Sequence, residues 1–145
     1  QFNVKDGVGI KLLQQQGIVV AVITAKDSQP LTQRMKDLSI DHFYPACDNK
    51  IKAFSELLTV LSLDKDQAAY VGDDVIDCRV MAQVGLAIAV QDAHDFVKQT
   101  ADYITSAYGG QGVAREVADL LLDAQFDLTE LYTQMAQGRK GRVVQ

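Results

Sequence analysis

Residues 68–77 read AAYVGDDVID, and this stretch does most to decide the fold. A short apolar strand ends at Gly72. Three carboxylates then follow within five residues: Asp73, Asp74 and Asp77. Carboxylates this close repel one another unless a cation joins them, and oxygen ligands suit a hard ion such as Mg²⁺. Because open α/β sheets bind ligands beyond the carboxyl ends of their strands, the stretch predicts a Mg²⁺ site at a strand end.

A simpler explanation for the same acids is helix capping. The side chain of Asp73 or Asp74 would accept hydrogen bonds from the first amides of the next helix, while the other carboxylates stay solvated. One capping residue is enough for that purpose. Three acids at this spacing therefore favour the metal site.

Length, charge and cysteine content exclude several classes of protein. The chain has 145 residues, of which 48% are hydrophobic, so it can form one domain with a core. Its net charge of -5 argues against non-specific nucleic-acid binding, which needs a basic face. The two cysteines, Cys47 and Cys78, form no CxxC motif, which argues against a disulfide framework or a zinc site. No apolar run reaches the length of a membrane span, so we expect a cytoplasmic protein with no membrane partner.

Strand-like and helix-like segments alternate along the chain. Strands are expected at residues 18–23, 41–44, 68–71, 86–90 and 103–104, and helices at residues 10–16, 30–38, 50–61, 74–84, 93–100 and 113–125. Residues 2–4 are expected to be extended and residues 6–9 to form a turn. The alternation predicts an α/β fold, a parallel sheet with helices on both faces. We expect one domain over residues 1–130 and a polar, basic tail over residues 131–145.

Three loops that follow predicted strands should meet at one edge of this sheet. The first carries Thr24 and Lys26, the second carries Lys50 and the third carries the acids after Gly72. A hydroxyl can hold phosphate oxygens, a lysine can neutralise their charge, and Mg²⁺ can bridge protein and phosphate. Thr24 alone is more typical of a turn, and Lys50 alone of a solvated helix start. Their order along the chain, each after a strand, is what predicts a phosphate site.

These residues resemble known motifs. Thr24, Lys50 and residues 72–77 are similar to the second, third and fourth motifs of the haloacid dehalogenase (HAD) superfamily. Residues 2–11, 68–77, 81–85 and 109–116 resemble the 3-deoxy-D-manno-octulosonate 8-phosphate phosphatases, a capless branch of that superfamily. The resemblance reaches to about Gln125. It implies a HAD-like, Rossmann-like fold and a cytoplasmic, homotetrameric, Mg²⁺-dependent phosphatase that acts on a keto-sugar acid phosphate in lipopolysaccharide biosynthesis.

The resemblance also implies roles for individual residues. Asp73 would bind Mg²⁺. Asp74 and Asp77 would support the metal site without binding the ion directly. Thr24 would hold the transferred phosphoryl group and Lys50 would neutralise it. A larger set would contact the substrate, although each of its cations alone is more typical of a solvated surface. That set is Asn3, Val4, Lys5, Asp6, Gly7, Lys11, Lys26, Arg34 and Lys50.

The chain departs from the family pattern in two places. Residues 24–26 read Thr-Ala-Lys where the family has threonine or serine, glycine and arginine, so the bidentate arginine fork is lost. The Asp-x-Asp-Gly motif, which implies the nucleophile and the general acid/base, does not occur in the sequence. We expect that motif upstream of Gln1, on a central strand that the sheet of this chain would then lack.

Two other classes of protein are alternatives to a phosphatase. A catalytically inactive, HAD-like oligomerisation domain, related to those of nucleotide-sugar synthetases, would fit a chain without a nucleophile. The acid cluster and Lys50 argue against it, because a structural domain gains nothing from carboxylates that repel. A response-regulator receiver domain shares the sheet, but its paired acids lie near the N-terminus, unlike the acids after Gly72.

Overall fold

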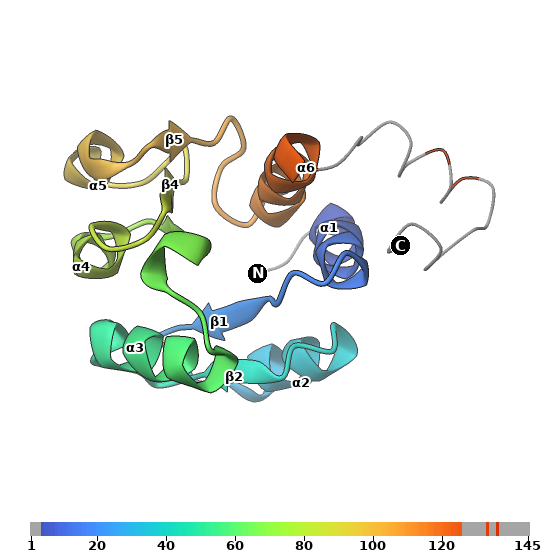
Figure 1. The fold of residues 1–145 in the computed structure, drawn as a ribbon, viewed down its shortest axis with the longest axis horizontal. Coiled ribbons are helices and arrows are strands. Elements are labelled where there is room, and N and C mark those ends of the chain that lie inside the picture. The colour runs from blue at the N-terminus through green and yellow to red at the C-terminus, as the bar shows by residue number, and fades with distance from the viewer. Residues whose placement is uncertain (1–3, 126–132, 134–135, 137–145) are drawn as a thin grey trace. The chain divides into compact units, whose positions relative to one another are not determined.

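The structure is a computed structural model, and it describes residues 4–125 together with Thr133 and Ala136. The contacts divide the chain into two compact units (Figure 1). Unit 1 consists of Gln1–Val20 and Gly110–Gln145, and unit 2 is Ala21–Gly109. Asn3 and most of the expected tail over residues 131–145 lie outside the described residues. Each unit is considered by itself below.

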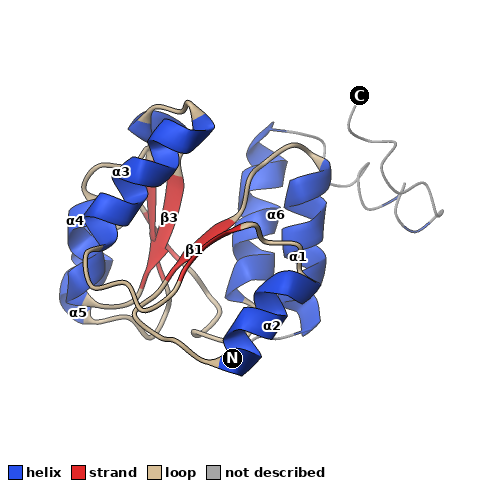
Figure 2. Ribbon diagram, turned by 90° about the horizontal axis from the view of Figure 1, so that it is seen from below, coloured by secondary structure: helices blue, strands red, loops and turns tan. Residues whose placement is uncertain are grey.

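Unit 1 contains two helices that pack side by side, α1 (Val4–Gln15) and α6 (Val113–Gln125) (Figures 1 and 2). Their shared core contains Leu12 and Leu13 from α1 and Ala118 and Leu122 from α6. The left-handed backbone at Gly17, with φ of 81°, follows the end of α1. The packing of two apolar helix faces therefore accounts for this unit.

The turn expected at residues 6–9 is wrong, because α1 begins at Val4 and runs through this segment. A contact distant in sequence explains the helix: a Cβ at Gly9 would lie 2.9 Å from the Cα of Arg115 in α6. The missing side chain at Gly9 thus lets the two helices approach closely. Asp6 is only 3% exposed, and its carboxylate accepts a hydrogen bond of 3.2 Å from the Arg115 amide in the first turn of α6.

Unit 2 is an α/β unit with parallel strands, which confirms the expected fold class. β1 (Ala21–Ile23) pairs with β2 (His42–Tyr44), and β3 (Ala69–Gly72), β4 (Leu86–Ala89) and β5 (Tyr103–Ile104) form a second sheet in that order. The helices are α2 (Gln29–Asp37), α3 (Lys50–Leu61), α4 (Cys78–Met81) and α5 (Asp95–Thr100), with short 3₁₀ turns η1 (Lys65–Gln67) and η2 (Val75–Asp77). Figure 2 shows α3, α4 and α5 alongside β3.

The strand expected at residues 18–23 is half as long as predicted, since β1 begins only at Ala21. Ile18 and Val20 pack instead against the apolar core of unit 1. The side chains of β1 are half-buried. Hydrophobic packing with α1 and α6 therefore overrides the strand propensity of Ile18 and Val20.

The helix expected at residues 74–84 is also shorter than predicted. The structure has η2 followed by the single turn α4, because side-chain carboxylates bind the backbone amides at its start. Asp74 Oδ1 accepts a hydrogen bond of 2.7 Å from the Val75 amide and so caps η2. At the other end, a Cβ at Gly85 would overlap the carbonyl oxygen of Asp66, so only glycine fits where the chain passes η1.

The centre of unit 2 is apolar and positions the acids. Ala87, Ile88 and Ala89 of β4 are buried, and Val80 and Met81 of α4 are buried beside them. The carboxyl ends of β3 and β4 therefore lie on a rigid support.

Among the described residues, no helix has the length and hydrophobicity that crossing a bilayer requires.

Candidate active site

The three acids lie directly beyond the carboxyl end of β3, as the sequence predicts. Gly72 ends the strand, and a Cβ there would lie 2.7 Å from the Cβ of Asp77 and 2.7 Å from the sulfur of Met81. Real Cβ atoms do not approach one another so closely. The glycine therefore makes the space in which the Asp77 side chain folds back against the strand.

The carboxylate of Asp77 is the centre of a hydrogen-bond network, and only 2% of its side chain is exposed. Its Oδ1 accepts from Lys50 Nζ at 2.8 Å and from the Tyr70 hydroxyl at 2.7 Å. Its Oδ2 accepts from the amides of Asp73 at 3.0 Å and of Asp74 at 3.2 Å. Four donors match the lone-pair sites of one carboxylate. Asp77 is thus fully used within the protein, and Lys50 neutralises its charge.

Electrostatics agree with this arrangement. Burial alone would raise the pKa of Asp77, but the hydrogen bonds from Lys50, Tyr70 and two amides outweigh it and hold the pKa below its usual value. Burial and then the hydrogen bond to Asp77 raise the pKa of Tyr70 far above its usual value, so its hydroxyl stays a donor. Partial burial and the nearby charge of Asp77 raise the pKa of Asp73. A cation beside Asp73 would relieve that unfavourable charge.

The repulsion among the three acids is therefore relieved at two of them. Lys50 neutralises Asp77, and Asp74 caps η2, so the capping explanation is right for that residue. Asp73 remains as an exposed carboxylate whose backbone is held by Asp77 and by the His94 amide, which donates to the Asp73 carbonyl oxygen at 3.2 Å. In the part of the chain that the structure describes, no three or more acidic, histidine or cysteine side chains converge as a metal site.

The loop after β1 is tied to the loop that leads to Lys50. The Thr24 amide donates to the Tyr44 carbonyl oxygen at 3.0 Å, and the Cys47 amide donates to the Thr24 carbonyl oxygen at 2.9 Å. Thr24 Oγ1 accepts from the Lys26 amide at 3.1 Å. Asn49 then caps α3 by accepting from the Lys52 amide at 3.1 Å. These bonds fix the two loops together at the carboxyl ends of β1 and β2.

The remaining predicted substrate contacts lie in both units. Lys26 is exposed in the loop after β1, and Arg34 is half-buried in α2 of unit 2. In unit 1, Lys11 is exposed on α1, while Asp6 is buried against α6. Gly7 is half-buried in α1, the backbone of Val4 and Lys5 forms the start of that helix, and Asn3 lies outside the described residues.

Sequence reasoning missed Tyr70, although a signal for it exists. Side chains two residues apart in a strand share one face, so Tyr70 stands on the same face of β3 as the vacant Cβ position of Gly72. The Asp77 side chain occupies that vacancy. A tyrosine two residues before a strand-ending glycine is therefore positioned to bind an acid that folds back against the strand.

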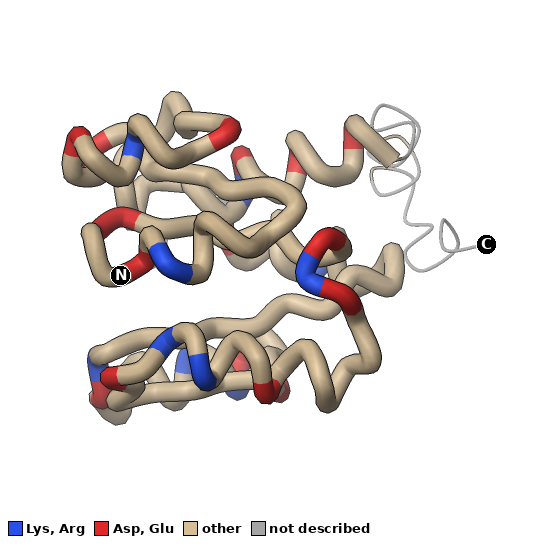
Figure 3. The backbone as a smooth tube through the Cα atoms, turned by 60° about the vertical axis from the view of Figure 1, so that its left-hand side comes forward, with Lys and Arg blue, Asp and Glu red and all other residues tan. Residues whose placement is uncertain are grey.

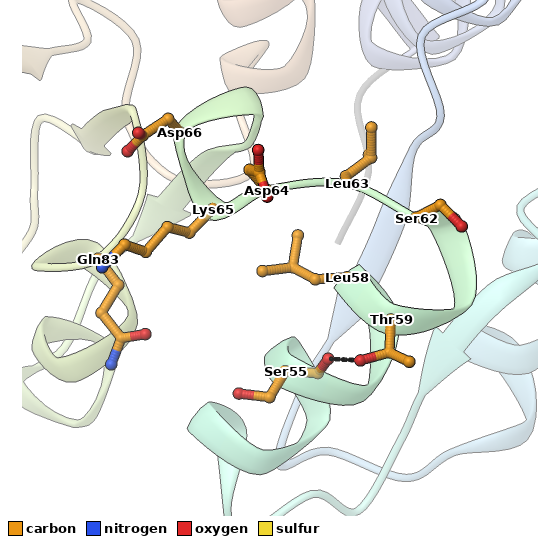
Figure 4. A pocket seen from close by; sticks show the side chains of 9 residues that line it. All are labelled: Ser55, Leu58, Thr59, Ser62, Leu63, Asp64, Lys65, Asp66 and Gln83. Atoms are coloured by element: carbon orange, nitrogen blue, oxygen red, sulfur yellow. Dashed lines mark hydrogen bonds between the residues drawn. The ribbon is translucent and has the colours of Figure 1, made fainter.

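Two hollows of the surface border α3, and neither is lined by Lys50, Tyr70 or the acids after β3. One, of about 640 Å³, is lined by residues at the far end of α3 and in η1, and Thr59 Oγ1 donates within it to the Ser55 carbonyl oxygen at 3.1 Å (Figure 4). Its lining on α3 begins at Ser55, about 7–8 Å along the helix from Lys50 at about 1.5 Å of rise per residue, and Lys50 does not line it. The other, of about 360 Å³, borders Cys47 and Asn49 in the loop before Lys50. Acidic and basic positions are interspersed along the backbone (Figure 3).

Comparisons with known proteins point to phosphatases. Residues 31–117 match the family model described as haloacid dehalogenase-like hydrolase. The 3-deoxy-D-manno-octulosonate 8-phosphate phosphatase KdsC of Escherichia coli K12 is 47% identical over 129 residues, which cover 89% of this chain and 69% of that protein. The crystal structure of the Yersinia pestis phosphatase of the same name has a TM-score of 0.84 at 48% identity, covering 86% of this chain and 67% of that one.

A third relative contains ligands. The crystal structure of 3-deoxy-D-manno-octulosonate 8-phosphate phosphatase from Moraxella catarrhalis, in complex with a magnesium ion, a phosphate ion and a KDO molecule, has a TM-score of 0.86. It is 36% identical to this chain, and the alignment covers 92% of this chain and 78% of that one. Magnesium is the ion that the acids after β3 predict, and phosphate is the group that these acids predict together with Thr24 and Lys50.

Proposed function

Because the chain belongs to the haloacid dehalogenase-like hydrolase family, we propose that it is a Mg²⁺-dependent phosphomonoesterase. Its substrate would be 3-deoxy-D-manno-octulosonate 8-phosphate, which it hydrolyses to the free sugar acid and phosphate. The observation that carries this proposal is the pair of Lys50 and buried Asp77 at 2.8 Å, directly beside the carboxylate-bearing Asp73. The name of the Escherichia coli relative, at 47% identity, supports the substrate.

The chemistry that we propose rests on positioning and on charge. In phosphoryl transfer, the protein holds the reacting groups in line and stabilises the charge on the phosphoryl oxygens. The ammonium group of Lys50, aligned by Asp77, would balance part of that charge, and Thr24 would hold one of the same oxygens. Asp73 would hold Mg²⁺, which when bound polarises the phosphoryl group. The Asp73 carboxylate is exposed, and carboxylate oxygens suit that ion.

The nucleophile belongs to the same proposal. By the family resemblance it is the first aspartate of an Asp-x-Asp-Gly motif, which does not occur in residues 1–145. Its oxygen would form a bond to phosphorus as the bond to the sugar oxygen breaks, and water would then release phosphate. The second aspartate of the motif would give a proton to the leaving oxygen.

Substrate recognition would use side-chain cations. The substrate carries both a carboxylate and a phosphate, and Lys26, Arg34, Lys11 and Lys5 are candidate counter-charges. Asn3, Val4 and Gly7 would contribute from the same N-terminal segment. Buried Asp6 would act by holding that segment in place rather than by contact with the sugar. A cytoplasmic location, a homotetramer and a part in lipopolysaccharide biosynthesis are further proposals that the family resemblance supports.

The assay measures phosphate release from 3-deoxy-D-manno-octulosonate 8-phosphate by the full-length gene product, with and without Mg²⁺. We expect turnover that EDTA abolishes and Mg²⁺ restores. The Asp73→Asn variant should need a much higher Mg²⁺ concentration, because a neutral amide is a weaker ligand than a carboxylate. A folded wild-type protein that releases no phosphate would refute the proposal and would favour a catalytically inactive, HAD-like oligomerisation domain.

A further inference from the structure

Tyr70 and Lys50 share one acceptor atom. The Tyr70 hydroxyl lies 2.7 Å from Asp77 Oδ1, and Lys50 Nζ lies 2.8 Å from the same oxygen. Tyr70 comes from the middle of β3, whereas Lys50 opens α3, so the shared oxygen joins a strand to a separate helix. A carboxylate oxygen has two lone pairs, and the hydroxyl occupies one of them. Lys50 is thereby restricted to the other.

We infer that Tyr70 is a positioning residue for the phosphate site, which aims the Lys50 ammonium group by occupying the second lone pair of Asp77 Oδ1. The inference rests on the proposed function, in which Lys50 meets the phosphoryl group. A lysine side chain is long and flexible, and the terminal torsion of a carboxylate is broad. Two donors on one oxygen remove much of that freedom, which a single ion pair would leave.

The network separates this role from that of the metal ligand. Tyr70 binds Oδ1 of Asp77, whereas the Asp73 and Asp74 amides bind Oδ2. Loss of the hydroxyl therefore frees the oxygen that holds Lys50 and leaves the two amide bonds in place. A general loss of structure would disturb both oxygens. Phosphate affinity and Mg²⁺ affinity should thus respond differently to a change at Tyr70.

The variant Tyr70→Phe tests this difference, because it keeps the ring that packs in the unit and removes only the hydroxyl. We expect kcat to fall about tenfold and inorganic phosphate, titrated by calorimetry at saturating Mg²⁺, to bind about tenfold more weakly. The Mg²⁺ concentration for half-maximal activity should stay within about twofold. Parallel weakening of Mg²⁺ and phosphate, or no change in either kcat or phosphate affinity, would overturn the inference.

A double-mutant cycle shows whether Tyr70 acts through Lys50. In a Lys50→Met background, Tyr70→Phe should cause no further loss of phosphate affinity, because the group that it aims is gone. An equal loss in both backgrounds would mean that Tyr70 acts by another route. Tyr103→Phe is the matched control, since Tyr103 opens β5 in the same sheet at the amino end of its strand.

The two proposals fail in different ways. Wild-type protein that binds phosphate with Mg²⁺ but does not hydrolyse the sugar phosphate refutes the proposed substrate, and the calorimetric comparison still decides the role of Tyr70. Wild-type protein that hydrolyses the sugar phosphate while Tyr70→Phe is unaffected refutes the role of Tyr70 alone. Wild-type protein that binds no phosphate refutes both.

Discussion

Among the residues that the structure describes, two carboxylates are almost fully buried, one in each unit, and the groups that hold them differ. Asp6 in unit 1 accepts a hydrogen bond from a backbone amide in the first turn of α6, and so joins two helices. Asp77 in unit 2 accepts from a lysine ammonium group and a tyrosine hydroxyl as well as from two amides. Burial alone therefore does not determine how a carboxylate is held. The proposed function uses the acid that pairs with Lys50 at a strand end.

The largest effect should come from breaking the ion pair of unit 2. Lys50→Met removes the cation that we propose for the phosphoryl oxygens, and kcat should fall about 10³-fold, as for loss of one preorganised electrostatic contact. Buried Asp77 would keep three donors but lose its counter-charge, so the free energy of unfolding should fall by about 1–3 kcal/mol. Phosphate release and urea unfolding measure the two effects.

The control for Lys50→Met is Lys36→Met, which removes an exposed cation from α2. It has the same change of charge without a buried partner. Equal losses of kcat in both variants would show that only net charge matters and would contradict a special role for the ion pair of Lys50 and Asp77.

Two glycines allow a second test of the contrast between the units. Gly72→Ala should push the Asp77 side chain away from β3, because the new Cβ would lie 2.7 Å from the Cβ of Asp77, and kcat should fall about 100-fold. Gly9→Ala should push α6 away from α1 and cost about 1–3 kcal/mol of stability, since its Cβ would meet the Arg115 backbone at 2.9 Å. Kinetics and thermal melting on both variants measure the two effects. A loss mainly of stability in Gly72→Ala and mainly of kcat in Gly9→Ala would contradict this expectation.

A smaller effect is expected from Asp6→Asn. The amide oxygen can still accept from the Arg115 amide but without a full charge, so the free energy of unfolding should fall by about 1 kcal/mol. Urea unfolding measures this change. Asp123→Asn, an exposed position on the same α6 helix, is the control and should change stability less. If the two variants lose the same stability, Asp6 does not hold the helix pair together.

The smallest effect concerns pH. The folded pKa of Asp77 is depressed, so its contribution to stability is present above the unfolded pKa of about 3.9 and is lost as pH falls through the folded value. Wild-type stability should therefore drop more steeply below about pH 4 than that of Asp77→Asn, which has no proton to gain. Urea midpoints across this range would test the sign. A steeper drop in the variant would contradict it.

Features governed by local sequence were predicted well. The bounds of α3 and α6 agree with the sequence, because regular apolar spacing specifies both helices, together with the Asn49 cap of α3 and the glycines before α6. The acids were correctly placed at the end of β3, since strand, glycine and carboxylates are adjacent in the chain. The fold class followed from the alternation of such segments.

Features that depend on distant residues were not predicted. The helical state of residues 6–9 depends on how Gly9 and Asp6 meet α6, more than one hundred residues later. Ile18 and Val20 have strand propensity but pack with helices. The partner of Asp77 could be proposed only as a metal ion from the acids alone, because the sequence does not reveal that Lys50 and Tyr70 converge on it.

The Asp77 carboxylate also makes two loop amides observable. Amides in an exposed loop normally exchange their protons with water rapidly, since opening there costs little free energy. The amides of Asp73 and Asp74 instead donate to a buried carboxylate oxygen, so their hydrogen exchange should be slow and should speed up when Asp77 is replaced. Two resonances in a deuterium-exchange spectrum would thus report whether the active-site loop is assembled, without substrate and without turnover.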